Sequence, residues 1–111
     1  MLREIEEEAR DIRDIPSALH FLVLAKAVKT IEAMGGEADT EHVTRRLAEE
    51  LDESTARAWA IVLTRRRVAE IRGGRVRLLD AGFAMVRRGV ADRAEQSALA
   101  YLSLVGWRLK E

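Results

Sequence analysis

The sequence predicts a mainly α domain that carries one small β element. Apolar side chains recur at steps of three and four along most of the chain, which is the spacing of one helix face. Between residues 68 and 79 the spacing changes to alternation, and Gly73-Gly74 separates the two alternating runs. Two adjacent glycines suit a tight hairpin turn, because both central residues of a type I′ turn need positive φ. We therefore expect a short β hairpin among helices.

The length and composition fit a single domain that stays in water. The 111 residues are enough for one hydrophobic core but not for two. The sequence has no cysteine, which excludes a disulfide scaffold and a thiolate zinc site. The N-terminus opens with acidic residues instead of a basic signal region, and polar side chains interrupt the apolar run over residues 18–33. We expect no signal peptide, no membrane span and a cytoplasmic location.

The first fifteen residues predict a short helix with an apolar stripe. Its apolar side chains recur at steps of three, four and three: Leu2, Ile5, Ala9 and Ile12. Such a short, highly charged helix needs a partner for its stripe, which is either the rest of this domain or a second copy. Pro16 fits the first turn of the next helix and separates the two.

Residues 17–34 predict a second helix that is apolar on more than one side. A helix of this kind is covered on more than one side. In a domain this small, the second cover is a terminal helix or another subunit. Gly35-Gly36 ends the helix, where a left-handed residue is favoured.

Two further helices are expected over residues 40–51 and 53–66, with a short break between them. Asp39 or Thr40 serves as the N-cap of the first, and Asp52 caps the second. The side chains of the second helix divide into two sets. The inward set is Ala56, Ala60 and Leu63, with Trp59 flanking it. The outward set is Thr55, Arg57, Ala58, Ile61 and Arg65.

Helix, tight turn, helix and hairpin is the order of a helix-turn-helix followed by a β wing. On this order, residues 18–88 resemble the winged helix-turn-helix of the MarR and PadR-like transcriptional regulators. The residues that carry the resemblance are Leu47-Ala48-Glu49-Glu50-Leu51, Asp52-Glu53-Ser54-Thr55-Ala56, Leu63, Arg72-Gly73-Gly74-Arg75-Val76 and Leu79-Asp80-Ala81-Gly82. The last run is similar to a Leu-Thr-x-x-Gly run that ends the wing in that family.

The resemblance implies a DNA-binding regulator, usually a homodimer whose terminal helices make the interface. It also implies three parts: an N-terminal helix over residues 1–15, a winged helix-turn-helix domain over 16–89, and a C-terminal helix over 90–111. This chain departs from the family at two places. Arg67 stands where the family often has glycine after the recognition helix, so a different C-cap is needed. Ala58 and Ile61 stand where polar, base-reading side chains are common.

The charge distribution favours nucleic acid more than the net charge does. The net charge is zero, which by itself argues against a nucleic-acid partner. Residues 1–40, however, hold five basic and nine acidic side chains, whereas residues 41–88 hold eleven basic and seven acidic ones. The positive excess therefore lies on the helix-turn-helix and the wing, where phosphate contacts would be made. Arginines that only solvate a helix face remain the alternative explanation.

We expect the helix over about residues 53–66 to enter the major groove of duplex DNA. The wing, about residues 68–79, would contact the backbone or the minor groove. The expected DNA contacts are Arg45, Thr55, Arg57, Arg65, Arg66, Arg72, Arg75 and Arg77. The alternative is a winged helix that binds protein in a replication or transcription assembly, with Ala58 and Ile61 facing the partner. Acidic Glu53 and the neutral overall charge favour that alternative.

The C-terminal helix is expected over residues 91–109, and it carries more apolar surface than a three-helix core covers. Together with the N-terminal stripe, it is the candidate interface of a homodimer. The expected interface residues are Leu2, Ile5, Ala9, Ile12, Ala98, Tyr101, Leu102, Val105 and Trp107.

Nothing in the sequence indicates catalysis, a cofactor or a metal ion. His20 and His42 are the only histidines, and neither has a neighbour at ligand spacing. Gly73-Gly74 is not part of a phosphate-binding GxxxxGK[ST] motif. No pattern locates a pocket for a small-molecule effector.

Overall fold

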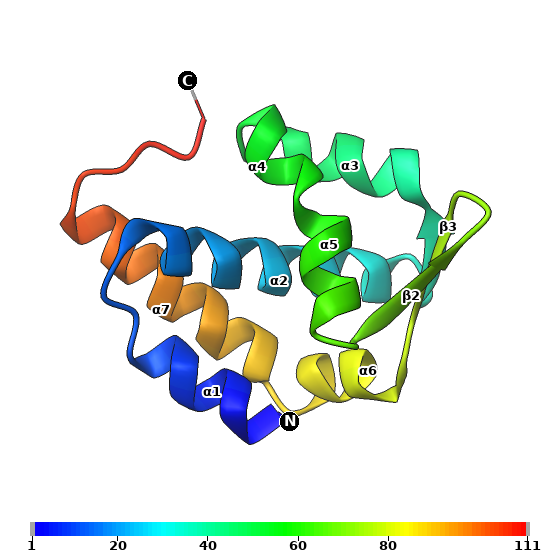
Figure 1. Cartoon of the computed structure of the whole chain (residues 1–111), viewed down its shortest axis with the longest axis horizontal. Helices are drawn as coiled ribbons and strands as arrows, with labels where there is room; N and C mark the ends of the chain where they lie inside the picture. Colours follow the sequence, from blue (N-terminus) through cyan, green and yellow to red (C-terminus); the bar gives the residue numbers. More distant parts are fainter. Residues whose placement is uncertain (1, 111) are drawn as a thin grey trace.

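The computed structural model describes residues 2–110. Residue 1 of the predicted N-terminal part (1–15) and residue 111 of the predicted C-terminal part (90–111) lie outside the described residues. The described chain is mainly helical with one small antiparallel sheet, as the sequence predicts at this level (Figure 1). The helices are α1 (Leu2–Arg10), α2 (Ile15–Ala33), α3 (Thr40–Ala48), α4 (Glu53–Arg57), α5 (Trp59–Arg65), α6 (Asp80–Arg87) and α7 (Val90–Leu104). The strands are β1 (Glu37–Asp39), β2 (Ala69–Arg72) and β3 (Arg75–Leu78).

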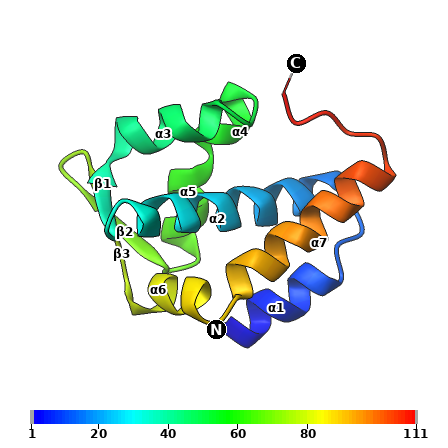
Figure 2. The same ribbon diagram turned by 180° about the vertical axis from the view of Figure 1, so that it is seen from behind.

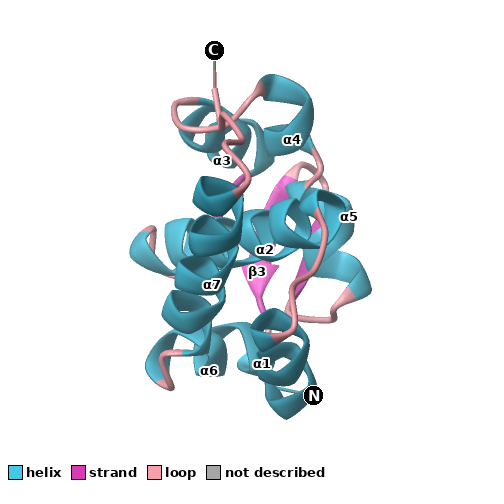
Figure 3. Ribbon diagram, turned by 90° about the vertical axis from the view of Figure 1, so that its left-hand side faces the viewer, coloured by secondary structure: helices cyan, strands magenta, loops and turns pink. Residues whose placement is uncertain are grey.

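Helix α2 is the centre of the molecule and is covered by other helices of the same chain. Asp14 caps it by accepting a hydrogen bond from the Ser17 backbone N–H at 2.8 Å, and Pro16 lies in its first turn. Seen nearly end-on, α2 lies between α7 and α5 (Figure 3). The prediction of a helix covered on more than one side is confirmed. Seen from behind, α7 packs beside α2, and α1 packs against α7 (Figure 2).

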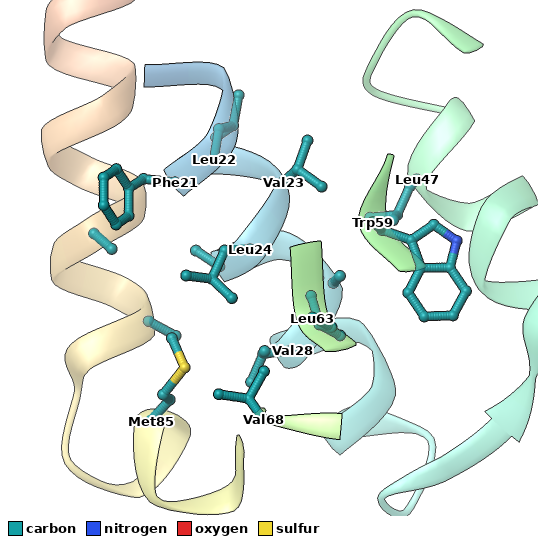
Figure 4. Packing of buried hydrophobic residues seen from close by; sticks show 14 of the residues in the cluster. Phe21, Leu22, Val23, Leu24, Val28, Leu47, Trp59, Leu63, Val68 and Met85 are labelled. Carbon is teal, nitrogen blue, oxygen red and sulfur yellow. The ribbon is translucent and has the colours of Figure 1, made fainter. Parts of the chain in front are cut away.

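The core lies where α2 meets α5, α6 and the sheet. Leu24 and Val28 of α2 point toward Leu63, Val68 and Met85, and all five are buried (Figure 4). Burying a side chain of this size contributes about 1.5–3 kcal/mol to folding. The core therefore fixes the position of α5 against α2.

Trp59 is more deeply buried than the sequence predicts, because the prediction placed it only at the flank of the inward set. Only 1% of its surface is exposed, and its Nε1–H donates to Thr44 Oγ1 at 2.9 Å. This hydrogen bond satisfies the polar atom of a buried indole. It also ties α5 to α3, so the two helices are held together by both packing and a polar contact.

The hairpin forms as predicted, but the sheet has a third strand. Gly73 and Gly74 have φ of 54° and 77°, which suits the I′ turn that joins β2 to β3. Strand β1, which the sequence did not predict, pairs antiparallel with the other edge of β3. The strand order is therefore β1-β3-β2, and buried Val76 is the central residue of the sheet.

The helix expected over residues 53–66 is divided at Ala58. The Ala58 backbone N–H donates to Thr55 O, three residues back, so the chain tightens there between α4 and α5. The next turn comes after α5, where Arg67 adopts a left-handed φ of 58°. Arg67 thus supplies the left-handed C-cap conformation that glycine most often supplies at the ends of helices.

The C-terminal helix ends at Leu104, five residues before its predicted end. Left-handed Gly106 follows, and the Trp107 backbone N–H donates to Leu102 O at 2.9 Å. The chain then returns toward α3 and α4. There Leu109 O accepts from the Asp52 N–H at 2.9 Å, and Lys110 Nζ donates to Ala48 O at 2.7 Å. Tertiary contacts with the tail therefore replace the last helical turns.

The predicted dimer interface is corrected for four residues. Ile5, Ala9, Ala98 and Leu102 are buried in the core of the single chain. The stripe of α1 packs on α7, so these side chains are already covered without a second copy. The partly buried members of the predicted interface, which pack against the same core, are Leu2, Ile12 and Tyr101. Two members remain exposed: Val105 and Trp107.

Within residues 2–110, no helix combines enough length with enough apolar character to cross a membrane.

Candidate nucleic-acid interface

The outer face of α4 and α5 carries basic and apolar side chains at helical spacing. Arg57, Ile61 and Arg65 lie four residues apart and are all exposed. Arg57 lies 3.8 Å from the Glu53 carboxylate, but both side chains are well exposed, and an ion pair of this kind contributes little. Ile61 is 59% exposed, which is unusual for a large aliphatic side chain. This face therefore presents an aliphatic centre between two guanidinium groups.

Thr55 does not belong to that face. It is half-buried and lines an apolar groove of about 300 Å³ between the first half of α2 and the helices α4 and α5. The other residues that line the groove are Pro16, Leu19, His20, Val23, Ala58 and Val62. Thr55 is therefore less available to DNA than the sequence predicts.

The outer face of the sheet is a mixed ladder of charges. Arg75 and Arg77 share the exposed face of β3, as their alternation with Val76 predicts. The register places Arg77 between Glu37 on β1 and Glu70 on β2, and its guanidinium pairs with Glu70. The positive charge of Arg77 is therefore balanced on the sheet itself.

The tip of the hairpin is more open than its base. Arg72 and Arg75 flank the Gly73-Gly74 turn and face each other across the strands. Arg75 lies 3.6 Å from Glu37, with about half of each side chain exposed. Arg72 has no acidic side chain within ion-pair distance among residues 2–110. The tip thus offers two cations to an external anion.

Arg66 is the clearest correction to the predicted DNA contacts. Its guanidinium makes two hydrogen bonds of 3.1 Å to the Glu8 carboxylate of α1. Its Nε–H donates to His20 Nε2 at 3.1 Å, and its Cζ lies 5.3 Å from the ring centroid of Phe21. Only 23% of this side chain is exposed. Arg66 therefore links three helices instead of facing a ligand.

The same cluster shifts two pKa values. Burial lowers the pKa of the His20 imidazole, and the nearby charge of Arg66 lowers it further. Neutral His20 is also the form that accepts the Arg66 hydrogen bond. The hydrogen bond from Arg66 lowers the pKa of the Glu8 carboxyl. The cluster therefore consists of a carboxylate, a guanidinium and a neutral imidazole.

Five arginines among the predicted DNA contacts remain available to an external anion, and we call them the exposed arginine group. Its members are Arg45, Arg57, Arg65, Arg72 and Arg75, and all are exposed. In the described chain, Arg45, Arg65 and Arg72 have no acidic group within 4.0 Å. Arg67 is also exposed, at the turn between α5 and β2, although it was not among the expected DNA contacts. The exposed position of Arg67 depends on the left-handed turn after α5. The sequence indicated this turn only through the absence of a glycine at residue 67.

Other kinds of site have less support among the described residues. Residues 2–110 contain no group of three or more His, Asp or Glu side chains that is arranged to hold a metal ion. No protein-family model, curated protein or solved structure matches this chain. The order of the elements and the surface they expose are therefore the features that bear on the function of this chain.

Proposed function

We propose that this chain is a winged helix-turn-helix that binds duplex DNA as a small dimeric transcriptional regulator. Helices α4 and α5 enter the major groove, and the β2–β3 hairpin lies over the backbone or the minor groove. The order α2, β1, α3, α4–α5, β2, β3, with β1 added to the hairpin, supports the winged-helix part of this proposal. The proposal involves neither catalysis nor a cofactor, and it implies a cytoplasmic location.

The observation that carries the proposal is the exposed arginine group. Two of its members, Arg57 and Arg65, lie on α4 and α5, and two more, Arg72 and Arg75, lie at the hairpin tip. Cations on a helix and on an adjacent hairpin match the phosphates that border one groove. The major groove is about 12 Å wide and admits an α-helix. The burial of Leu63 and Val68 keeps α5 and the start of the hairpin fixed relative to each other.

Fluorescence anisotropy with random-sequence duplex DNA tests the proposal. We expect micromolar binding that weakens steeply between low and moderate salt, because phosphate contacts release counterions. Replacing Arg65 and Arg72 together with alanine should weaken binding on every sequence and reduce the salt slope by about two. The matched control is Arg13→Ala, which removes an exposed arginine that pairs locally with Asp11 before α2. Absence of binding by the wild-type chain at low salt would contradict the proposal.

A second candidate function is protein binding through the same helix. The exposed side chain of Ile61 beside Ala58 favours it, because interface centres are enriched in apolar contacts. In that case Ile61→Glu should abolish capture of a protein partner, whereas the Arg65 and Arg72 replacements should have a smaller effect. A chain that binds DNA with a steep salt dependence and loses this binding on arginine removal would argue against this candidate.

A further inference from the structure

The centre of the outer face of α5 lacks a hydrogen-bonding side chain that could distinguish bases. Ile61 presents only carbon atoms there, and Ala58, at the break just before α5, adds no polar side-chain atom. The Thr64 hydroxyl donates to the backbone oxygens of its own helix, at 2.8 Å to Ala60 O. Only the arginines at either end of the face offer hydrogen-bond donors to a groove. Any base recognition by the middle of this face must therefore be apolar.

In the major groove of DNA, thymine presents an apolar group, its C5-methyl. We infer that Ile61 recognises a thymine methyl and thereby makes this chain prefer sites with thymine at one position of each half-site. This inference rests on the proposed DNA binding and deepens it by naming the base that α5 selects. Contact with the methyl would also cover an aliphatic side chain that is 59% exposed in the chain alone.

The charges around Ile61 favour DNA as the occupant of this face over an apolar protein surface. Arg65 lies one turn after Ile61 on α5 and has no acidic group within 4.0 Å among residues 2–110, so an apolar partner would leave its guanidinium group without an anion. The grooves of DNA are bordered by phosphates, which pair with arginine. Arg65 is four residues from Ile61, which is about 6 Å along the helix. That length corresponds to about two base pairs, so a phosphate contacted by Arg65 lies about two steps from the thymine.

The test begins with duplexes enriched by the full chain from a random-sequence library. The best-bound duplex is remade with uracil in place of thymine, one position at a time, so that each change removes only a methyl group. We expect one position in each half-site to weaken binding about fourfold, the effect of one buried methyl group. Replacement at the other thymines should leave the affinity unchanged.

Two variants show whether Ile61 is the residue responsible. Ile61→Ala should bind the thymine and uracil duplexes equally, whereas Ile61→Val should keep most of the preference. Because Ile61 is exposed, neither change should alter the thermal midpoint measured by circular dichroism. A discrimination that survives in Ile61→Ala overturns the inference. So does an equal loss of affinity on both duplexes, which would indicate a structural role.

The outcomes also separate this inference from the proposed function. Salt-dependent binding without any uracil-sensitive position leaves the proposed function standing and overturns the methyl recognition. The same conclusion would follow if the enriched duplexes shared no thymine position in their half-sites. No binding to any duplex overturns both.

Discussion

At the scale of single residues, the burial of His20 beside Arg66 makes the stability of the fold depend on pH. The pKa of His20 lies below its ordinary value of 6.5, so the folded chain binds fewer protons there than the unfolded chain. Stability from this group is therefore fully present above about pH 6.5 and is lost as the pH falls toward the folded pKa. Urea unfolding at a series of pH values between 7.5 and 5 should show this loss.

The control for this prediction is His20→Gln, which keeps a polar side chain but does not titrate. Its free energy of unfolding should be nearly constant over the same range. Glu8 acts in a separate window, because its pKa is lowered from 4.5 and its contribution is lost only at more acidic pH. Parallel pH profiles of the wild type and His20→Gln down to pH 5 would show that His20 is not the titrating group.

At the scale of elements, the turn after α5 carries strain that a glycine would relieve. Arg67 has a φ of 58°, a left-handed conformation that costs a residue with a side chain about 1 kcal/mol. We expect Arg67→Gly to raise the free energy of unfolding by about that amount, as measured by urea denaturation. Arg65→Gly, two residues earlier and within α5, should lower it by about 1 kcal/mol. If both variants changed the free energy of unfolding in the same direction, this explanation of the turn would be contradicted.

The elements that the sequence predicted are those with local signals. The Gly73-Gly74 hairpin, the proline in the first turn of α2 and the apolar periods of the helices each act over a few residues. Strand β1 was missed because it is three residues long, with exposed Glu37 and Asp39 on either side of Ala38. Its strand conformation comes from pairing with β3, about 40 residues later. The early end of α7, by contrast, has a local signal that the prediction overlooked, which is the left-handed Gly106 just after the helix.

The candidate site shows the same division. Helical spacing was enough to predict that Arg57, Ile61 and Arg65 are exposed. Arg66 was assigned to DNA because its partner Glu8 lies 58 residues away in the sequence, on a different helix. The balanced charge of Arg77 depends on strand register, and one of its two acidic neighbours is on the unpredicted β1. Sequence spacing therefore located the surface, and tertiary contacts decided which arginines remain available on it.

At the scale of the whole molecule, the chain supplies most of its own cover. The packing of α7 against α2 is reinforced by ion pairs from Lys26 and Lys29 to Glu95, at 3.0 and 2.8 Å. Burial opposes ionisation of Glu95, but the hydrogen bonds from the two lysines outweigh it and lower the pKa of this carboxyl. Apart from Ile61, the large hydrophobic side chains that stay exposed among residues 2–110 lie at the end of α7 and just after it. Leu104 is 83% exposed, and Val105 and Trp107 are 45% and 43% exposed.

We propose that this C-terminal apolar surface, Leu104, Val105 and Trp107, joins two copies of the chain. A two-fold contact places the same patch of each copy against the other, so one substitution removes a side chain from both halves of the interface. Leu104→Glu would place two carboxylates in that contact without disturbing the buried core. We expect light scattering to give twice the 12.5 kDa chain mass for the wild type and the mass of a single chain for this variant.

The matched control is Ile61→Glu, which introduces the same charge at another exposed aliphatic residue and should keep the mass of the wild type. The two variants should also differ on DNA. Leu104→Glu leaves the exposed arginine group intact, so one half-site should bind as before, and only the gain from two half-sites one helical turn apart should be lost. A wild-type chain that is monomeric at micromolar concentration, or a dimer that Leu104→Glu leaves intact, would contradict the assignment. In either case the exposed end of α7 has another role, and a chain that is monomeric would contact DNA through a single recognition helix.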